Sequence, residues 1–326
     1  MTESGDGVPE YDVLIVGGGP AGLSAALNLG RALMRVLLID ADRPRNAATL
    51  VSHGFLTRDG VSPHELRRLA REELAGYPNV EIRTRQRVFD IGPVGLRDHG
   101  AGGGFRAEEG FRAEVGRREP TESVRARAVL LATGLREQLP DVPNLRGFYG
   151  VSLFSCVACD AWDLREKRLA LIGESADLVA RARLISRWTS ELTVFTHGSV
   201  AIGPAEEAEL IAQGIAVERS PIVELAGERG VITGIRVADG GEHAIDGGFV
   251  QPQWDAELGY LREVMPDADE AGHLIVDRSG RTSRPGLYAA GDIAAPGPQQ
   301  LVVAAGAGAR VAAVIVHDTL GVTTTH

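Results

Sequence analysis

Short apolar runs and helical patterns alternate along most of the chain. An apolar run at 11–16 leads into a glycine turn and a helical pattern, and the same order returns at 167–188. Near the end, a strand-like run at 287–290 precedes a small-residue helix that begins near Gln300. Strands that alternate with helices are typical of parallel sheets covered by helices. The pattern therefore predicts an α/β fold with two units of the nucleotide-binding type.

The segments between these units have weaker patterns. Residues 63–74 have apolar positions on one helical face, and 80–91 has the pattern of one strand. The glycine-rich segment 98–125 contains GFRAE twice and predicts a β-hairpin excursion, with a variable surface loop as the alternative. An apolar strand then ends at Ala132, and 136–148 carries two prolines without a clear period. That last segment predicts a linker between domains.

The first glycine turn has the spacing of a dinucleotide site. Gly17, Gly19 and Gly22 occupy the positions that allow a tight turn, approach of a pyrophosphate and close packing of helix on strand. The helix start adds free N–H groups and a partial positive charge. Asp40 ends the next strand, where its carboxylate can accept hydrogen bonds from ribose hydroxyls. These features predict a site for an adenosine dinucleotide without a 2′-phosphate.

The second glycine turn lacks parts of this pattern. Gly173 keeps the first glycine position, but Ser175 and Leu178 occupy the second and third. A β-carbon at Ser175 would crowd a pyrophosphate, and Glu174 would add a negative charge beside it. The strand that follows ends without an arginine that could bind a 2′-phosphate. We expect a nucleotide-type fold here whose ligand contacts are missing.

The last predicted strand also ends in a polar side chain. Gly291 and Asp292 close this strand, and the helix near Gln300 follows after a loop. Asp292 can hydrogen-bond a ribityl hydroxyl, and the positive end of the helix can face the N1 and C2 carbonyl of a flavin. The alanine-rich helix would also allow close packing, and the two roles are compatible.

Composition and charge restrict the setting. The chain has 326 residues, is 44% hydrophobic and carries a formal net charge of -10, which disfavours nucleic acid or a membrane surface as a partner. The N-terminal residues are acidic where a signal peptide would be basic and then apolar, and Arg310 interrupts the most apolar late stretch. We therefore expect a cytoplasmic protein.

The only two cysteines, Cys156 and Cys159, form one C-x-x-C. In a reducing compartment such a pair is typical of a redox or metal-binding role rather than of a structural disulfide. Zinc would need two further ligands, and the sequence has neither a second cysteine pair nor an H-x3-H run. Redox chemistry is favoured, and no metal site is predicted. Asp160 follows the pair and is a candidate acid/base, with a solvated helix cap as the alternative.

Four motifs together resemble the low-molecular-weight thioredoxin reductases over nearly the whole chain. They are the GGGPAG turn, ATG at 132–134, C-x-x-C-D at 156–160 and AAGD at 289–292. The resemblance implies two Rossmann-like three-layer α/β domains, the second inserted in the first, and a homodimer.

The same resemblance implies domain limits and a cofactor. An FAD-binding domain would comprise 1–137 and 251–326, and a degenerate pyridine-nucleotide-type domain carrying the C-x-x-C would comprise 138–250. The residues expected at the FAD, with Val88 against the adenine, are Gly17, Gly18, Gly19, Pro20, Ala21, Gly22, Asp40, Val88, Ala132, Gly291, Asp292, Gln299, Gln300 and Leu301.

The departures from those reductases indicate a branch of the family. Thioredoxin reductases have an intact second glycine motif and a His-Arg-Arg clamp for NADPH, and this chain has neither. These departures, with RPRNAATLVSHGFLTRDG and FVQPQWD, resemble the flavin-dependent dithiol oxidases of the gliotoxin and holomycin type, and most resemble the bacterial, holomycin-type enzymes. In that branch Arg45, Asn46 and His53 would also lie by the FAD, although His53 could equally be a plain loop residue.

This branch implies a direction of electron flow. Cys156 would exchange with a small-molecule dithiol, Cys159 would face the flavin, and O2 would take the electrons as hydrogen peroxide, in antibiotic biosynthesis and self-resistance. Charge-assisted hydrogen bonds contribute about 1.5 to 3 kcal/mol each, so loss of two clamp contacts should weaken NADPH on the order of a hundredfold or more. The alternatives are a disulfide reductase fed by NADPH or another donor, and a flavoprotein without turnover.

Overall fold

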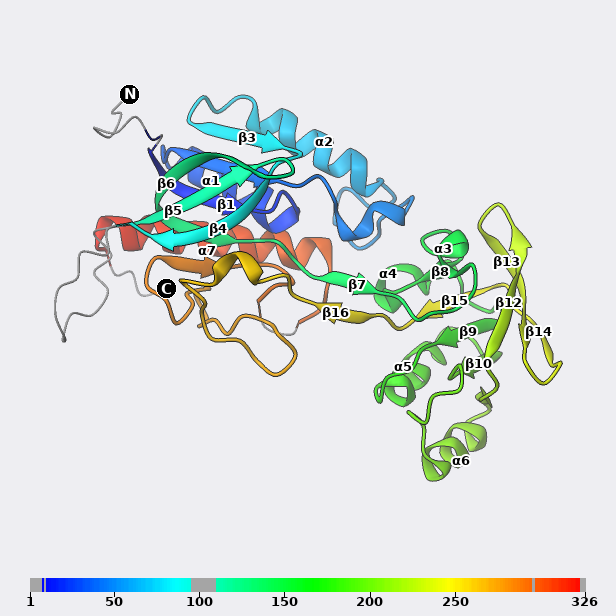
Figure 1. The fold of residues 1–326 in the computed structure, drawn as a ribbon. Coiled ribbons are helices and arrows are strands. Elements are labelled where there is room, and N and C mark those ends of the chain that lie inside the picture. The colour runs from blue at the N-terminus through cyan, green and yellow to red at the C-terminus, as the bar shows by residue number, and fades with distance from the viewer. Residues whose placement is uncertain (1–7, 9, 95–109, 295–296, 323–326) are drawn as a thin grey trace, which may run out of the picture.

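The structure is a computed structural model that describes residues 8, 10–94, 110–294 and 297–322. Figure 1 shows two α/β units, one holding both ends of the described chain and the other holding its middle. The chain leaves the first sheet after β6 (Pro120–Leu131) and returns to it with β17 (Leu287–Ala289). The second unit is therefore inserted in the first, as predicted.

Among the described residues, the first sheet has seven strands, in the order β3-β2-β1-β6-β5-β4, with β17 also paired to β6. The pairs that join β1, β2, β3, β6 and β17 are parallel, and those between β4, β5 and β6 are antiparallel. The long strand β6 belongs to both parts. The other strands are β1 (Glu10–Val16), β2 (Val36–Asp40), β3 (Val80–Thr84), β4 (Arg87–Pro93) and β5 (Phe111–Gly116).

Apolar side chains fill both faces of the parallel part. Val13 and Ile15 of β1 pack under the helices, which are α1 (Pro20–Arg31), α2 (Pro63–Leu74) and α7 (Leu301–Leu320). Leu14, between them, points to the other face and packs under the antiparallel strands. A strand buried on both faces reads as a continuous apolar run, which explains why 11–16 lacks an alternating pattern.

Helix α7 combines the length and hydropathy of a membrane span, with a mean hydropathy of 1.6. In the structure it packs closely along α1. A β-carbon at Gly308 would lie 2.0 Å from the carbonyl oxygen of Ala21, so the approach of the two helices requires glycine there. Val311 and Ile315, on the same face, are buried in the core. Packing against α1 therefore explains the small and apolar residues of this helix.

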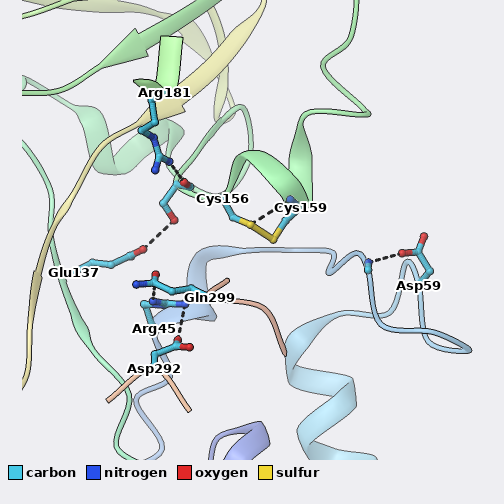
Figure 2. The surroundings of a disulfide bond; sticks show 10 residues. Arg45, Asp59, Glu137, Cys156, Cys159, Arg181, Asp292 and Gln299 are labelled. Atoms are coloured by element: carbon cyan, nitrogen blue, oxygen red, sulfur yellow. Dashed lines mark hydrogen bonds and ion pairs between the residues drawn. A yellow bond between two sulfur atoms is a disulfide. The ribbon is translucent and has the colours of Figure 1, made fainter. Parts of the chain in front are cut away.

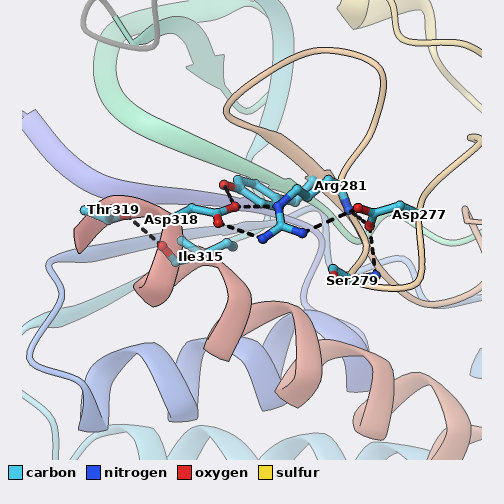
Figure 3. Close-up of polar contacts among 7 residues, drawn as sticks. Asp277, Ser279, Arg281, Ile315, Asp318 and Thr319 are labelled. Atoms are coloured by element: carbon cyan, nitrogen blue, oxygen red, sulfur yellow. Dashed lines mark hydrogen bonds and ion pairs between the residues drawn. The ribbon is translucent and has the colours of Figure 1, made fainter. Parts of the chain in front are cut away.

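The C-terminal end of α7 is held by an ion-pair cluster (Figure 3). The Arg281 guanidinium donates to both carboxylate oxygens of Asp318, each at 2.7 Å, and also contacts Asp277. The Tyr288 hydroxyl, from β17, donates to Asp318 at 2.8 Å. Hydrogen bonds from Arg281 lower the pKa of Asp318. The cluster joins α7 to the strand that precedes the predicted flavin loop.

The second unit repeats the three-layer plan. Among the described residues its main sheet has five parallel strands, in the order β11-β10-β9-β15-β8. Helices α5 and α6 cover one face, and α3 with the antiparallel sheet β12-β13-β14 covers the other. The elements are α3 (Leu145–Phe148), β8 (Leu153–Phe154), β9 (Leu169–Ile172), α5 (Leu178–Ile185), β10 (Leu192–Phe195), α6 (Pro204–Ala212), β11 (Ala216–Glu218), β12 (Ile222–Glu228), β13 (Val231–Val237), β14 (Glu242–Ala244) and β15 (Gly247–Val250).

The structure corrects two local predictions. Residues 80–91 form two strands, β3 and β4, instead of one, because Arg85 has a φ of +57° and interrupts the extended backbone between them. The predicted linker 136–148 contains α3 and β7 (Arg136–Gln138), which pairs antiparallel with β16 (Gln253–Asp255). The short η2 (Gly259–Leu261) follows β16.

The predicted hairpin is present in part. Strands β5 and β6 pair antiparallel, and the second GFRAE copy runs into β5. The first copy, at 104–108, lies outside the described residues.

Candidate active site

The first glycine turn leaves open space at the start of α1. Gly19 is the N-cap, and a β-carbon added there would meet no protein atom within 4 Å. A β-carbon at Gly17 would instead lie 2.3 Å from the carbonyl oxygen of Ala132, and one at Gly18 would lie 2.3 Å from Oδ2 of Asp40. Two of these glycines are therefore required by the protein's own backbone and core, whereas Gly19 faces a space that the described residues do not fill.

The start of α1 offers donors to a group in that space. No side chain of the described residues caps this helix, and Pro20, at its first position, has no N–H. The next N–H groups, of Ala21 and Gly22, belong to the first turn, which has no acceptor within the helix. Backbone donors beside an open space and a partial positive charge suit a pyrophosphate.

Asp40 lies beside Gly18 of the first glycine turn. It ends β2, is 8% exposed, and its Oδ1 accepts a hydrogen bond of 2.8 Å from the Asp42 N–H. Its Oδ2 forms an ion pair of 2.5 Å with Arg71 of α2. The carboxylate is thus held in one orientation beside Gly18.

A second group of polar side chains lies at the carboxyl end of β17. Arg45, in the short helix η1 (Arg45–Ala48), forms an ion pair of 2.9 Å with Asp292 and donates to Gln299 at 2.8 Å. Its guanidinium also stacks on Trp254 of β16, 4.8 Å from the ring centroid. Burial raises the pKa of Asp292, and the Arg45 charge opposes that change. Gln300 caps α7 directly beyond this group.

Cys156 and Cys159 form a disulfide, with a sulfur–sulfur distance of 2.02 Å, at the start of the short helix α4 (Val157–Asp160). Sγ of Cys156 accepts a hydrogen bond of 3.2 Å from the Cys159 N–H. In Figure 2 the disulfide lies over the group formed by Arg45, Asp292 and Gln299. The fold thus brings a redox pair to the unit that carries the first glycine turn.

Asp160, the last residue of α4, is largely removed from solvent. Burial raises the pKa of its carboxyl to about 7, the charge of Asp163 adds to the rise, and His53 opposes it. A solvated helix cap would keep an ordinary value, so this carboxyl differs from that alternative. A group that titrates near neutral pH is suited to proton transfer.

His53 connects the two units beside this carboxyl. Its Nδ1 lies 3.3 Å from Asp59, within its own loop, and its Nε2 lies 3.2 Å from Asp163, just after α4. The structure therefore places this predicted flavin-side residue at the segment that follows the C-x-x-C.

The second glycine turn is filled by side chains. A β-carbon at Gly173 would lie 2.7 Å from Cβ of Gln251 and 2.8 Å from Cδ2 of Leu178. Asp177 crosses the same edge and accepts hydrogen bonds from the Ser175 hydroxyl at 2.6 Å and the Gln251 amide at 2.7 Å. A hydrogen-bonded group of Ser175, Asp177 and Gln251 therefore lies at the carboxyl ends of β9 and β15, where such sheets bind nucleotides.

The remaining predicted residues lie in ordinary positions. Val88 packs, partly buried, against the apolar cluster on the side of the antiparallel strands. Asn46 lies in η1, Leu301 begins α7, and Gly291 has a φ of +79° at the end of the last strand segment.

Sequence reasoning did not single out several polar residues of this junction. Gln251 follows a strand that is buried throughout, so its place at the carboxyl end of a parallel strand could have indicated it. The others come together only through tertiary contacts, without a sequence signal, and are Glu137, Tyr149, Ser155, Asp177 and Arg181.

Residues 11–308 match the family model described as pyridine nucleotide-disulphide oxidoreductase. The chain therefore belongs to this family of flavin-type oxidoreductases. Its fold is similar to a Bacillus anthracis structure described as "Putative Thioredoxin Reductase TrxB", with 32% identity, a TM-score of 0.85, and coverage of 95% of this chain and 99% of that one. The structure of HlmI is similarly close, with 30% identity, a TM-score of 0.85, and coverage of 98% and 95%.

Among curated proteins, the chain is 29% identical to an alkyl hydroperoxide reductase component of Pseudomonas putida over 310 residues, which is 92% of this chain and 56% of that protein. It is 30% identical to an Arthroderma benhamiae protein described as a probable thioredoxin reductase over 189 residues, which is 58% of this chain and 44% of that protein. The chain thus spans about half the length of these two relatives.

Proposed function

We propose that the chain is an FAD-dependent dithiol oxidase. It would close an intramolecular disulfide in a small natural product, such as a holomycin-like or gliotoxin-like dithiol, through Cys156 and Cys159, and pass the electrons to O2 to give hydrogen peroxide. The observation that carries this proposal is the difference between the two glycine turns. Gly19 faces open space, whereas Asp177 crosses the second turn. The hydrogen-bonded side chains at the second turn disfavour a nicotinamide donor there and favour entry of the electrons through the disulfide.

FAD fits the first unit because its two halves have separate partners. The space at Gly19 suits the pyrophosphate, Asp40 suits the ribose, and Asp292 with Arg45 lies at the flavin end. When bound, FAD would supply a two-electron acceptor that returns the cysteine pair to the disulfide and passes the electrons to O2. FMN lacks the adenosine half and would leave Asp40 without a ligand partner.

A Gly19→Ala variant tests this cofactor assignment. Its β-carbon meets no protein atom, so the variant should fold like the parent protein, but it enters the space assigned to the pyrophosphate. We expect the Kd of the apo-protein for FAD to rise by about tenfold or more, measured by flavin fluorescence, and FAD to be the flavin released from the parent protein. Gly259→Ala, which also meets no atom within 4 Å, is the matched control. An unchanged Kd in Gly19→Ala would contradict the assignment.

The thiol chemistry needs two exchanges. A substrate thiolate attacks Sγ of Cys156, the bond to Cys159 breaks, and Cys159 leaves as a thiolate. The second substrate thiol then attacks the substrate sulfur of the mixed disulfide, and Cys156 leaves. The substrate disulfide has formed, and the cysteine pair holds two electrons. The Cys159 N–H supports this order because it stabilises a thiolate at Cys156.

Asp160 would act as the general acid and base in these steps. Two thiol protons leave the substrate, and the exchanging thiols gain or lose protons in turn. A carboxyl with a pKa of about 7 is protonated in part of the molecules at neutral pH, and can therefore both donate and accept. Asp160 directly follows Cys159 in the chain.

A disulfide reductase is the second candidate function. It is favoured by the relatives described as thioredoxin reductases and by the family to which the chain belongs. In that case NADPH or another donor would reduce the flavin first, and the cysteine pair would pass electrons outward.

Anaerobic stopped-flow absorbance with two donors separates these functions. A reduced holomycin-like or gliotoxin-like dithiol should bleach the flavin rapidly. NADPH should do so slowly or not at all, because Asp177 lies across the second glycine turn, where a nicotinamide nucleotide would bind. Air should then restore the oxidised spectrum, with one hydrogen peroxide formed per disulfide. Rapid bleaching by micromolar NADPH would instead establish the reductase.

A further inference from the structure

A carboxylate that the sequence did not indicate lies between the two units. Glu137 belongs to β7, in the connection from the first sheet to the second. Its Oε1 accepts two hydrogen bonds, one of 2.6 Å from the Tyr149 hydroxyl and one of 3.0 Å from the Ser155 hydroxyl. Ser155 directly precedes Cys156. Figure 2 shows Glu137 pointing toward the segment at Cys156, on the same side of the disulfide as Arg45.

Ser155 is held from its other side as well. Its carbonyl oxygen accepts a hydrogen bond from Nη2 of Arg181, in α5. The hydroxyl thus belongs to the connection between the units, and the carbonyl belongs to the second unit. A residue fixed through both groups sets the course of the backbone at Cys156, which caps α4.

The connection also contacts the predicted flavin end of the first unit. Trp254 of β16 lies directly opposite Glu137 in the register of the antiparallel pair, so their side chains lie on the same face. Arg45 stacks on Trp254 and forms its ion pair with Asp292. The charge of Arg45 also acts on the Tyr149 hydroxyl, whose pKa is raised mainly by burial and by Glu137.

We propose that Glu137 is a positioning residue that sets the disulfide segment against the flavin site, through Ser155 on one side and Trp254 with Arg45 on the other. The contacts form a continuous series from Asp292 to the residue before Cys156. Transfer between two groups is sensitive to displacements of about 1 Å, so a loosened Ser155 should slow exchange with the flavin more than exchange with a thiol in solution. The inference rests on the flavin site of the proposed function, and it holds for either direction of electron flow.

Anaerobic reduction of the FAD-loaded protein by dithiothreitol tests this role. Two quantities are followed in parallel. One is the flavin absorbance, and the other is the number of electrons that have entered through the disulfide, which equals the cysteine thiols, titrated after acid quench and removal of dithiothreitol, plus two for each reduced flavin. In Glu137→Ala the electrons should enter at the parental initial rate, whereas bleaching should slow by about tenfold or more. In Glu137→Gln, whose amide oxygen can accept both hydrogen bonds, both rates should stay within about threefold of the parent.

Two further variants make the result specific. Glu257→Ala is the matched control, because Glu257 pairs with Arg136 and Arg87 at the same connection without reaching the second unit among the described contacts, and it should behave like the parent. Ser155→Ala removes one partner and leaves Glu137 in place, and should also slow bleaching alone. An unchanged rate of flavin bleaching in Glu137→Ala would overturn the proposal. An equal loss in the rate of flavin bleaching and in the rate of disulfide reduction would also overturn it. Because dithiothreitol serves as donor, failure of the natural dithiol to react would not affect this result.

Discussion

Replacement of either cysteine by serine should reduce steady-state turnover of a dithiol by about a thousandfold or more, because neither exchange can be completed with one sulfur. The two variants should differ in their spectra. Cys156→Ser leaves a lone thiolate at Cys159, which we propose faces the flavin, and should show a long-wavelength charge-transfer band with oxidised FAD. Cys159→Ser should lack this band.

A pH titration of that band gives a direct measurement. The band should appear as the thiol ionises and should bleach when the thiol is alkylated, while Cys156→Ala serves as a control for the serine hydroxyl. A band found with Cys156 as the only thiol would reverse the assigned order of the pair.

Replacement of Asp160 by asparagine should remove proton transfer while stabilising the fold. We expect the rate of anaerobic flavin reduction by a dithiol to fall by about 10²- to 10⁴-fold, a typical contribution of a general acid or base. In the parent protein this rate should depend on pH with an apparent pKa near 7, and in Asp160→Asn that dependence should disappear. Stopped-flow absorbance across pH 5 to 9 measures both.

The stability of Asp160→Asn has a definite pH dependence. Burial raises the pKa of Asp160 from 3.8 to about 7, so ionisation of this carboxyl is harder in the folded protein than in the unfolded chain. Below about pH 3.8 this carboxyl does not lower the free energy of unfolding. As the pH rises its ionisation lowers that free energy progressively, and the full loss, on the order of 4 kcal/mol at most, is reached above about pH 7. Asp160→Asn should raise Tm at pH 8 and leave it almost unchanged at pH 4.

Asp163→Asn is the control for this experiment, because Asp163 is exposed and pairs with His53 at the same segment. It should lower the apparent pKa of Asp160, since it removes a like charge, but should keep most of the activity. A variant of Asp160 that keeps both its activity and its pH profile would exclude the acid/base role. Lost activity together with gained stability would mark a group kept for function at a cost to the fold.

The sequence predicted an α/β fold with two units because that prediction depends on local patterns, whereas the insertion of the second unit was implied by the family resemblance. Apolar runs, glycine spacing and the acidic residues Asp40 and Asp292 are readable without tertiary contacts. In the structure Asp40 ends β2, and Asp292 lies just beyond the end of β17. The helix at 63–74 also matches α2, because Ser62 caps it through the Glu65 N–H and its apolar positions follow the helical period.

Other features depend on contacts between distant segments. Glu137 could be recognised only from its hydrogen bonds with Tyr149 and Ser155. The 80–91 segment is divided into two strands at a single residue with left-handed backbone, Arg85. The damaged second glycine motif was readable, but its filling by Gln251, 74 residues after Asp177, was not. Sequence reasoning thus found what is missing at the second turn, and the structure adds what replaces it.

The second unit has a nucleotide-type sheet, although side chains cross the carboxyl ends of β9 and β15 where a nucleotide would bind. The position of β8 indicates another role for this sheet. This two-residue strand pairs with β15 through Leu153 and Gly248 and leads directly to the cysteine pair. Gly248 in turn lies so close to β9 that a β-carbon would be 2.2 Å from the Ala170 carbonyl oxygen. The sheet thus fixes the position of the strand that leads to the disulfide. Changes in the ligand contacts at the edge of this sheet would leave the disulfide in place, whereas loss of β15 or β9 would remove the support of the strand that leads to it.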